Sequence, residues 1–505
     1  MIQVRNPATL ELIQELTIAT PVEVGAAVAR ARQAQSSWQK TSFAERARLL
    51  YRLRDLLLDD GERLADILTS ETGRPRDEVY GNEIFYLCNA MGAWAKNSER
   101  YLRRQNISPS FPLVKAKKVY STYAPLGVIG IISPWNFPLT LTLGEALPAL
   151  MAGNAVVIKP SELTPLSALF GADLAAKAGF PKDVLQVVVG YGDAGEALVD
   201  HADMVAFTGS VETGKRVMHR ATDRLIPVSL ELGGKDPMIV LKEADLDRAA
   251  GACVWGALMN SGQACTSIER VYVEAPVYNA FVDKVVNRVN AIRQGQCSDE
   301  VDIGCMTSET QLNKVAAQVD EARAKGAKSL TGGRRNPRLP GYYYEPTVLI
   351  DVDHSMQVMS EETFGPVIPI MAVKDPEEAV RLANDSRYGL SASIYSRDKA
   401  AAARLAEELT SGAVCVNDSL VNFIVLEAPM GGRKDSGFGH RHGAVGIQKY
   451  CQQKTIVVDR FGLKQEFPWY PASKKKARQM RHLLNLLCHS GWGPKLRAIK
   501  GLISS

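Results

Sequence analysis

Apolar positions in the N-terminal part of the chain recur with a helical period. Over residues 21–39 and 42–73, apolar side chains are spaced three and four positions apart, which predicts amphipathic helices. Gly73 closes the second stretch and is predicted to cap the C-terminus of a helix. Residues 117–127, KKVYSTYAPLG, instead alternate with a period of two and end in Pro-Leu-Gly, which predicts an exposed strand and a turn.

From residue 128 the pattern changes to short β-rich runs separated by helix-like segments. The first block contains the runs VIGIIS, NAVVIKP, DVLQVVVG, MVAFTGS and PVSLELGG. A second block of the same kind covers residues 235–436, and QKTIVVDR is a further strand. Alternation of strands and helices at this spacing predicts an α/β fold with parallel sheets covered on both faces.

The composition is that of an ordinary globular protein. The chain has 505 residues, 46% hydrophobic and 23% charged, which predicts two or three domains. No run of about 18 apolar residues suggests a membrane span, and the N-terminus does not resemble a signal peptide. The cysteines form no CxxC pair and no zinc-like cluster, so we expect no structural metal and a reducing, cytoplasmic setting. The eight cysteines are Cys88, Cys253, Cys265, Cys297, Cys305, Cys415, Cys451 and Cys488.

Positive charge is concentrated at the C-terminus. The net charge is +5, yet residues 472–505 alone carry eight Lys or Arg and no Asp or Glu. The rest of the chain is therefore close to neutral, which argues against nucleic-acid binding. Leucines and isoleucines alternate with these cations, as in a basic amphipathic segment that contacts a membrane surface. The alternative is a helix that packs on a neighbouring subunit or covers an active-site mouth.

Cys265 differs from the other cysteines because its neighbours are small and polar. It lies in residues 260–267, NSGQACTS, a stretch poorly suited to a packed core. A thiolate is a strong nucleophile for a carbonyl carbon, so the stretch predicts an accessible nucleophile. A small buried residue without a chemical role is the alternative.

A cysteine nucleophile also requires a general base and a group that binds the oxyanion, and two other polar residues can supply them. Glu231, in SLELGGK, can project from a strand end as a general base. Asn136, in SPWNFP, can donate an N–H to a developing oxyanion, which stabilises a transition state by about 3 kcal/mol. Each also has an ordinary interpretation, as a solvated turn glutamate and as part of a packed Asn-Phe-Pro turn.

Seven segments strengthen this interpretation because they occur together. In chain order they are SPWNFP, NAVVIKPSE, AFTGSVETG, LELGGK, GQACTS, EETFGPV and PMGGRKDSGFG. This set resembles the aldehyde dehydrogenase superfamily over residues 1–460. The resemblance implies NAD(P)-dependent oxidation of an aldehyde to a carboxylic acid, through a cysteine thiohemiacetal and then a thioester. It also implies a Rossmann-like cofactor domain, an α/β catalytic domain, a β-strand oligomerisation arm and a homodimer or homotetramer.

The resemblance also implies where the domains lie and what the site residues do. Cys265 is expected to be the nucleophile, Glu231 to activate the hydrolytic water, and Asn136 with the Cys265 N–H to form the oxyanion hole. Lys159 is also expected to be a catalytic residue. The expected cofactor-binding residues are Ser133, Trp135, Lys159, Ser161, Glu162, Gly209, Ser210, Gly233, Glu362 and Phe364. The expected boundaries are 1–113 and 127–233 for the cofactor domain, 234–436 for the catalytic domain, 114–126 and 437–460 for the arm, and 461–505 for the basic tail.

Two of these segments have a physical interpretation of their own. FTGSVETG follows a strand and begins a helix, so its amides can face a phosphate. It can equally be an N-capped helix with Thr208 or Ser210 as the cap. Glu162 favours NAD, because a carboxylate near the adenosine ribose repels a 2′-phosphate; Lys159 offsets part of this repulsion, so NADP stays open.

The chain departs from many hydrolytic relatives after the SGFG segment. They continue with Arg-Glu, and that acid can assist a proton relay, whereas this chain continues His440-Arg441-His442. An auxiliary carboxylate is therefore in doubt, and a solvated surface turn is the simplest interpretation of these three residues.

The substrate is less defined than the chemistry. In FPLTLTLGEALPAL, Phe137, Leu141 and Gly144 share one face at helical spacing. Gly144 either widens the tunnel for a longer aldehyde or packs a helix. The predicted wall residues are Phe137, Leu141, Gly144, Ala264, Thr266, Asn422, Phe423 and Met430.

Several substrates and functions therefore stay open. No arginine pair for a substrate carboxylate stands out, yet the whole chain looks similar to bacterial succinate-semialdehyde dehydrogenases. Succinate semialdehyde and a longer aliphatic aldehyde are both candidates. A CoA-acylating relative and a non-catalytic membrane-associated scaffold of the same fold are the alternative functions.

Overall fold

The computed structural model describes residues 1–111, 114–297, 300–467 and 469–504. The chain divides into two compact units. The first comprises Met1–Arg103 and Tyr123–Lys454, and the second comprises Arg104–Thr122 and Thr455–Ser505.

Helices make up most of the N-terminal hundred residues, as the periodicity predicted. Thr20 and Ser42 each begin a helix with a capping box, pairing with a glutamate three residues later. Gly73 ends a helix at φ 74°, which confirms it as a C-cap. The stretch 42–73 forms two helices, because the backbone leaves the helical region at Asp60. The elements are β1 (Ile2–Arg5), β2 (Leu12–Leu16), α1 (Pro21–Trp38), α2 (Phe43–Asp59), α3 (Gly61–Thr72), α4 (Arg76–Val79), a π-helical turn (Tyr80–Phe85) and α5 (Tyr86–Leu102).

The first sheet has the strand order β17-β9-β8-β5-β6-β7 in the described part of the chain. Its strands are parallel except β17, which runs antiparallel to β9 and pairs Gly437 with Glu231. The strands are β5 (Val128–Ile132), β6 (Ala155–Lys159), β7 (Leu185–Val187), β8 (Met204–Thr208), β9 (Val228–Glu231) and β17 (Gly437–Phe438).

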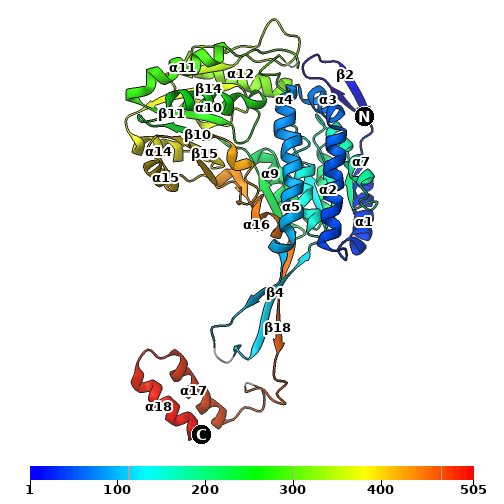
Figure 1. Ribbon diagram of the computed structural model, residues 1–505, viewed down its shortest axis with the longest axis vertical. Coiled ribbons are helices and arrows are strands. Elements are labelled where there is room, and N and C mark those ends of the chain that lie inside the picture. The colour runs from blue at the N-terminus through cyan, green and yellow to red at the C-terminus, as the bar shows by residue number, and fades with distance from the viewer. Residues whose placement is uncertain (112–113, 298–299, 468, 505) are drawn as a thin grey trace. The chain divides into compact units, whose positions relative to one another are not determined.

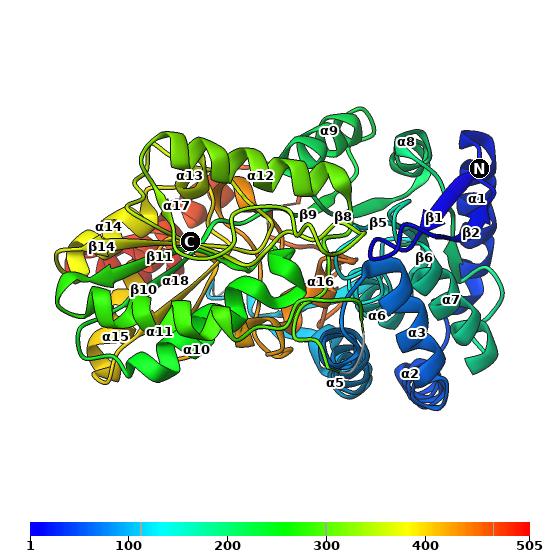
Figure 2. The same cartoon turned by 90° about the horizontal axis from the view of Figure 1, so that it is seen from above.

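Helices cover both faces of this sheet (Figure 2). Alternate side chains point to opposite faces of a strand, so Val128, Val157 and Val205 pack with α1, α8 and α9. Ile129 and Ile158 pack on the other face with α2, α5, α6 and α7. The remaining helices of this part are α6 (Leu143–Met151), α7 (Leu166–Ala178), α8 (Gly192–His201), α9 (Val211–Thr222) and α16 (Gly443–Gln448).

The second sheet has the order β12-β13-β14-β11-β10-β15-β16 among the described residues. Only β12 is antiparallel to its neighbour. Helices α10 and α11 lie against one face and α12, α14 and α15 against the other (Figures 1 and 2). The elements are β10 (Asp236–Val240), α10 (Leu246–Leu258), β11 (Ile268–Glu274), α11 (Tyr278–Asn290), α12 (Glu309–Ala324), β12 (Lys328–Ser329), β13 (Thr347–Ile350), α13 (Gln357–Ser360), β14 (Val367–Val373), α14 (Pro376–Asn384), β15 (Ser391–Tyr395), α15 (Lys399–Glu408) and β16 (Ala413–Val416).

These two sheets confirm the predicted α/β class, and one segment lies elsewhere than its sequence suggested. Residues 437–450 were expected to belong to the oligomerisation arm. They instead supply β17 to the edge of the first sheet and helix α16, which packs on α5 and α6. The pairing of Gly437 with Glu231 is responsible, because a strand edge attracts a partner with free backbone groups.

The second unit contains the ends of an antiparallel sheet and a helical pair. Strands β3 (Gln105–Ile107), β4 (Lys117–Pro125) and β18 (Cys451–Asp459) have the order β18-β4-β3. Lys117 pairs with Asp459 at 2.6 Å and also with Glu466. The basic tail forms α17 (Lys474–Cys488) and α18 (Trp492–Ile503), which pack against each other. None of the described helices is both long and apolar enough to cross a membrane.

Candidate active site

Cys265 lies directly after a sharply turned loop. Asn260, Ser261 and Gly262 all have left-handed backbones, at φ 52°, 54° and 72°. A side chain at position 262 would place its Cβ 2.1 Å from the carbonyl oxygen of Gly365. Only glycine fits there, so Gly262 lets this loop turn tightly.

The polar residues of the same loop hold it in place. Asn136 donates from Nδ2 to the carbonyl oxygen of Gln263 at 2.9 Å, and Asn260 donates to the carbonyl oxygen of Asn136 at 2.9 Å. The side-chain oxygen of Gln263 accepts from the Thr307 N–H at 2.9 Å. These bonds join the loop to the segment that carries Asn136. One of them is made at Gln263, two residues before Cys265. The second N–H of the Asn136 amide is left for another acceptor.

Glu231 lies at the end of β9, and the glycines that follow bring this strand end onto the cysteine loop. A Cβ at position 234 would lie 2.2 Å from the carbonyl oxygen of Cys265, so the backbones touch there. Gly234 also donates its N–H to Glu362 Oε1 at 3.0 Å. The two glycines of LELGGK therefore permit close approach of Glu231, Cys265 and Glu362.

Burial controls the protonation of the two candidate reactive groups. It raises the pKa of Glu231 to about 7, and Arg441 and Lys449 oppose this increase. Glu231 Oε1 is buried and has no hydrogen-bond partner. Burial raises the pKa of the Cys265 thiol to about 12, and Arg441 opposes that change as well. The thiol is thus neutral at physiological pH, and Glu231 titrates in the range that suits a general base for water.

A cavity of about 300 Å³ reaches Cys265. Its walls are mainly apolar, and no Lys, Arg or His is among its lining residues. Four of the predicted wall residues lie in this lining, namely Phe137, Leu141, Thr266 and Phe423. Phe85, Tyr86, Trp255, Met259, Leu420 and Ile424 also line it and were not predicted.

The other four predicted wall residues lie outside the lining. Gly144 packs against helix α5, with its missing Cβ 3.4 Å from Tyr86 and from Leu87. Ala264 belongs to a small buried cluster, Asn422 donates to Ser391 at 3.2 Å, and Met430 is bonded through its backbone to Arg441.

The helix that contains Gly144 begins at Leu143. Before it, the N–H of Thr140 donates to the Glu83 carboxylate and the Thr140 hydroxyl donates to the Asn82 carbonyl oxygen. Phe137 and Leu141 therefore precede this helix, and they line the cavity whereas Gly144 does not.

The predicted dinucleotide residues gather around the carboxyl ends of β6, β8 and β9. Ser210 caps helix α9 and accepts from the Thr213 N–H at 3.3 Å, so the alternative with Ser210 as the cap is confirmed. Lys159, at the end of β6, is buried and lies 3.5 Å from Glu162. Ser161 and Gly209 lie in the loops that follow β6 and β8.

Aromatic and polar groups continue this surface toward Glu231. The rings of Trp135 and Phe364 meet edge to face, 5.5 Å between centroids. The carboxylate of Glu362 would lie 2.5 Å from a Cβ at Gly233, so this glycine leaves room for it. The hydroxyl of Ser133 is buried without a partner. A helix N-terminus, a buried cation, an unpartnered hydroxyl and an aromatic pair suit a nicotinamide dinucleotide.

The predicted surface turn at His440–His442 is wrong for two of its three residues. Arg441 and His442 are only 6% and 3% exposed, whereas His440 is exposed. Arg441 binds Glu145 at 3.0 Å and lies 3.9 Å from Glu231. No sequence signal pointed to Glu145, because it lies in an otherwise apolar helix far from Arg441 in the chain.

A cysteine at the end of an apolar cavity, together with residues that suit a dinucleotide, is typical of nicotinamide-dependent oxidoreductases, and comparison with known proteins identifies the family. The model of the aldehyde dehydrogenase family matches residues 1–456. The chain is 42% identical to a Mycobacterium ulcerans protein named "Putative succinate-semialdehyde dehydrogenase (NADP(+)) 2", over 88% of this chain and 86% of the relative. It is 38% identical to the "4,4'-diapolycopene aldehyde oxidase" of Methylomonas sp, over 95% of this chain and 90% of the relative.

Solved structures agree with this assignment. The NAD+ complex of an aldehyde dehydrogenase from Bacillus cereus superimposes with a TM-score of 0.87 at 35% identity, covering 90% of this chain and 93% of that one. The chain belongs to the aldehyde dehydrogenase family. It is an enzyme that oxidises aldehydes with NAD(P), in a family whose members are typically oligomeric.

Proposed function

We propose that this enzyme oxidises an extended, apolar aldehyde to the carboxylic acid. The observation that carries the proposal is the cavity of about 300 Å³ that reaches Cys265 with mainly aromatic and aliphatic walls. Each apolar side chain that covers a ligand gains roughly 25 cal/mol per Å² of apolar surface removed from water. The walls therefore favour a hydrocarbon chain attached to the reacting carbonyl.

Succinate semialdehyde fits these walls poorly. Its second carboxylate would enter the cavity, where the lining contains no cation and one acid, Asp418. Burying an unpaired charge is expensive. The mycobacterial relatives are named for this substrate, but the lining of the cavity in this chain favours an uncharged tail.

The relative from Methylomonas supports an apolar substrate. Its alignment covers 95% of this chain, so it leaves about 25 residues unmatched and must extend into residues 461–505. That protein is named for a carotenoid-type aldehyde, which is long and apolar.

The chemistry that we propose follows from the three polar groups beside the cavity. The Cys265 thiol gives up its proton to solvent, and the sulfur bonds to the carbonyl carbon of the aldehyde. The free N–H of Asn136 and the backbone N–H of Cys265 stabilise the resulting oxyanion. After oxidation, Glu231 removes a proton from the water that attacks the thioester carbon. The bond from this carbon to the Cys265 sulfur breaks, the sulfur takes up a proton to become a thiol again, and the carboxylic acid leaves the site.

Binding of the dinucleotide falls to residues of the first sheet and of the loop before β14. Ser210 and Lys159 would hold its phosphates and ribose, with Ser133, Ser161 and Gly209 beside them, and Glu362, Gly233, Trp135 and Phe364 would position the nicotinamide. When bound, the nicotinamide supplies the hydride acceptor. The exposed carboxylate of Glu162, beside Lys159, favours NAD over NADP through charge repulsion.

We also propose that the basic tail contacts an anionic membrane surface. Helices α17 and α18 carry the eight Lys and Arg of residues 472–505 together with exposed Leu484, Trp492, Leu496 and Ile503. Cations and exposed apolar groups on one helical pair suit an interfacial helix, and each cation contributes roughly 1 kcal/mol near anionic lipid. Such contact would bring the enzyme to apolar aldehydes dissolved in lipid.

The test of substrate class is a chain-length series. Reduction of NAD and of NADP would be followed by absorbance, with aliphatic aldehydes of increasing length and with succinate semialdehyde, in the absence of CoA. We expect kcat/KM to rise with chain length and to exceed the value for succinate semialdehyde. Preference for the semialdehyde would overturn the apolar substrate, and no reduction without CoA would favour an acylating enzyme.

The tail is tested separately by vesicle sedimentation. The full chain should sediment with vesicles that contain anionic phosphatidylserine and not with neutral ones, and deletion of residues 472–505 should abolish this. Equal sedimentation of the two proteins would exclude the tail as the membrane contact. Replacing Lys474, Lys475 and Lys476 by Glu keeps the helices and should weaken the binding strongly.

A further inference from the structure

Glu231 lies beside a buried charged cluster. At its centre, Glu145 of helix α6 binds Arg441 at 3.0 Å and Lys449 at 2.6 Å, and it accepts from the hydroxyl of Tyr450. The same Arg441 lies 3.9 Å from Glu231, a longer and looser contact. Arg441 therefore stands between two carboxylates and binds one of them closely.

The backbone fixes Arg441 relative to Glu231. Gly437 pairs with Glu231 in the first sheet, and Leu232 donates its N–H to the Ser436 carbonyl oxygen at 3.0 Å. Arg441 and Met430 exchange two backbone hydrogen bonds, at 2.7 and 3.3 Å. These backbone bonds hold the segment that carries Arg441 beside the strand that carries Glu231.

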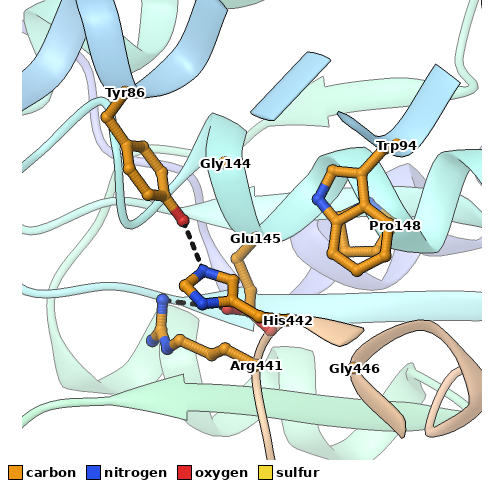
Figure 3. A pocket seen from close by; sticks show the side chains of 8 residues that line it. All are labelled: Tyr86, Trp94, Gly144, Glu145, Pro148, Arg441, His442 and Gly446. Atoms are coloured by element: carbon orange, nitrogen blue, oxygen red, sulfur yellow. Dashed lines mark hydrogen bonds and ion pairs between the residues drawn. The ribbon is translucent and has the colours of Figure 1, made fainter. Parts of the chain in front are cut away.

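The cluster is closed to substrate. The hollow beside Glu145 and Arg441 measures about 10 Å³, close to the size of one water molecule, and Figure 3 shows Tyr86, His442 and Trp94 around it. Burial lowers the pKa of His442 to about 3, so its imidazole is neutral, and its ring nitrogen lies 2.8 Å from the Tyr86 hydroxyl. The charges that act on Glu231 in this cluster are those of Arg441, Lys449 and Glu145.

We propose that Arg441 and Glu145 form a positioning pair for the general base Glu231. Arg441 attracts the Glu231 carboxylate and keeps it available as a base inside a buried site, and Glu145 holds the guanidinium so that it cannot close onto Glu231 as a tight ion pair. A carboxylate in a closed pair with arginine would be a poor base, because the charge that makes it basic is neutralised. The proposal rests on the proposed role of Glu231.

Where many relatives carry an acid after the SGFG segment, this chain carries Arg441 and pairs it with Glu145. The carboxylate comes from α6 and the cation from the turn, so the two charges balance locally. Glu145 does not touch the cavity that reaches Cys265, so it acts on the reaction only through Arg441.

The two halves of the pair have opposite predicted effects on the pH profile of kcat. In Arg441→Met, Glu231 loses its nearest cation, so the acidic limb of kcat should move to higher pH by about one unit. In Glu145→Gln, Arg441 is released toward Glu231, so the limb should move to lower pH and the plateau should fall several-fold. Arg441→Lys retains a cation and should restore most of the wild-type profile.

Two readouts separate a positioning role from general damage to the fold. Each variant should retain the pre-steady-state burst of reduced cofactor, because the burst precedes hydrolysis. The melting temperature and circular dichroism of each variant are compared with Arg220→Gln, which removes an exposed arginine that also binds two carboxylates, Glu196 and Asp200. That control should leave the pH profile unchanged.

The outcomes are distinct. Shifts of the acidic limb in the same direction, or an unchanged limb in both folded variants, would overturn the positioning pair. If the wild-type enzyme shows a burst but Glu231→Gln shows wild-type steady turnover, the proposed role of Glu231 has failed instead. Opposite shifts together with rescue by lysine would establish the pair.

Discussion

Two hollows share Tyr86 in their linings and differ in volume and in polarity. The ring of Tyr86 lines the cavity of about 300 Å³ and stacks on Phe423 with 4.9 Å between centroids. The same residue borders the hollow of about 10 Å³ that contains Glu145 and Arg441 (Figure 3). One hollow is apolar and large, and the other is charged and small.

The difference separates two tasks that a hydrolytic thiol enzyme must perform. An apolar wall selects the substrate tail by burial and needs no charge. The general base, in contrast, needs charges around it that do not reach the substrate, because burial alone raises its pKa. A tyrosine between the two regions presents its ring to one and its hydroxyl to the other.

The largest expected effect on turnover is at Cys265, which the apolar cavity reaches. Cys265→Ala should abolish turnover for every aldehyde, because no other nucleophile can carry the acyl group. Glu231→Gln should retain a burst of reduced cofactor while steady turnover falls by about a hundredfold or more. Rapid-mixing absorbance measures both phases, and equal loss of burst and turnover would contradict a role in hydrolysis.

The next largest effect is expected from a substitution in the apolar wall, which tests the large cavity independently of the charged hollow. Phe423→Ala removes the ring that stacks on Tyr86, and loss of a buried aromatic contact should lower kcat/KM for long aldehydes by roughly tenfold to a hundredfold. Short aldehydes, which do not reach this wall, should lose little. Phe461→Ala, at a ring that is 68% exposed, is the matched control. An equal loss for all chain lengths would argue against a binding role.

The pH dependence reports on the charged hollow. Glu231 is a base only when ionised, and its pKa is raised to about 7 by burial. Where hydrolysis limits the rate, kcat should therefore rise about tenfold per pH unit below 7 and level off above it. The burst amplitude should vary less over the same range. A profile that is flat from pH 5 to 8 would show that Glu231 is not the limiting base.

The smallest expected effect concerns the cofactor. Glu162→Gln removes the carboxylate beside Lys159, so kcat/KM with NADP should rise relative to NAD by about threefold to tenfold. Neither hollow is touched by this change, so the chain-length preference should stay as in the wild-type enzyme. An unchanged cofactor ratio would remove Glu162 from the account of cofactor choice.

Local sequence determined the elements of this protein and the residues with the clearest chemistry. The capping boxes at Thr20 and Ser42, the cap at Gly73 and the alternating strands follow from neighbouring residues alone. Cys265 was recognisable because its neighbours are small and polar, and those neighbours let the loop turn at Gly262. Such features depend on contacts within a few residues, which a sequence displays directly.

Tertiary structure alone decided which charges surround Glu231 and which helix Gly144 packs against. Glu145 and Lys449 are 304 residues apart in the chain and meet at 2.6 Å. Gly144 packs against α5 and does not line the cavity, although Phe137 and Leu141 of the same segment do. Charges and packing across such separations leave no local pattern, because the position of each partner depends on how the whole sheet and its helices assemble.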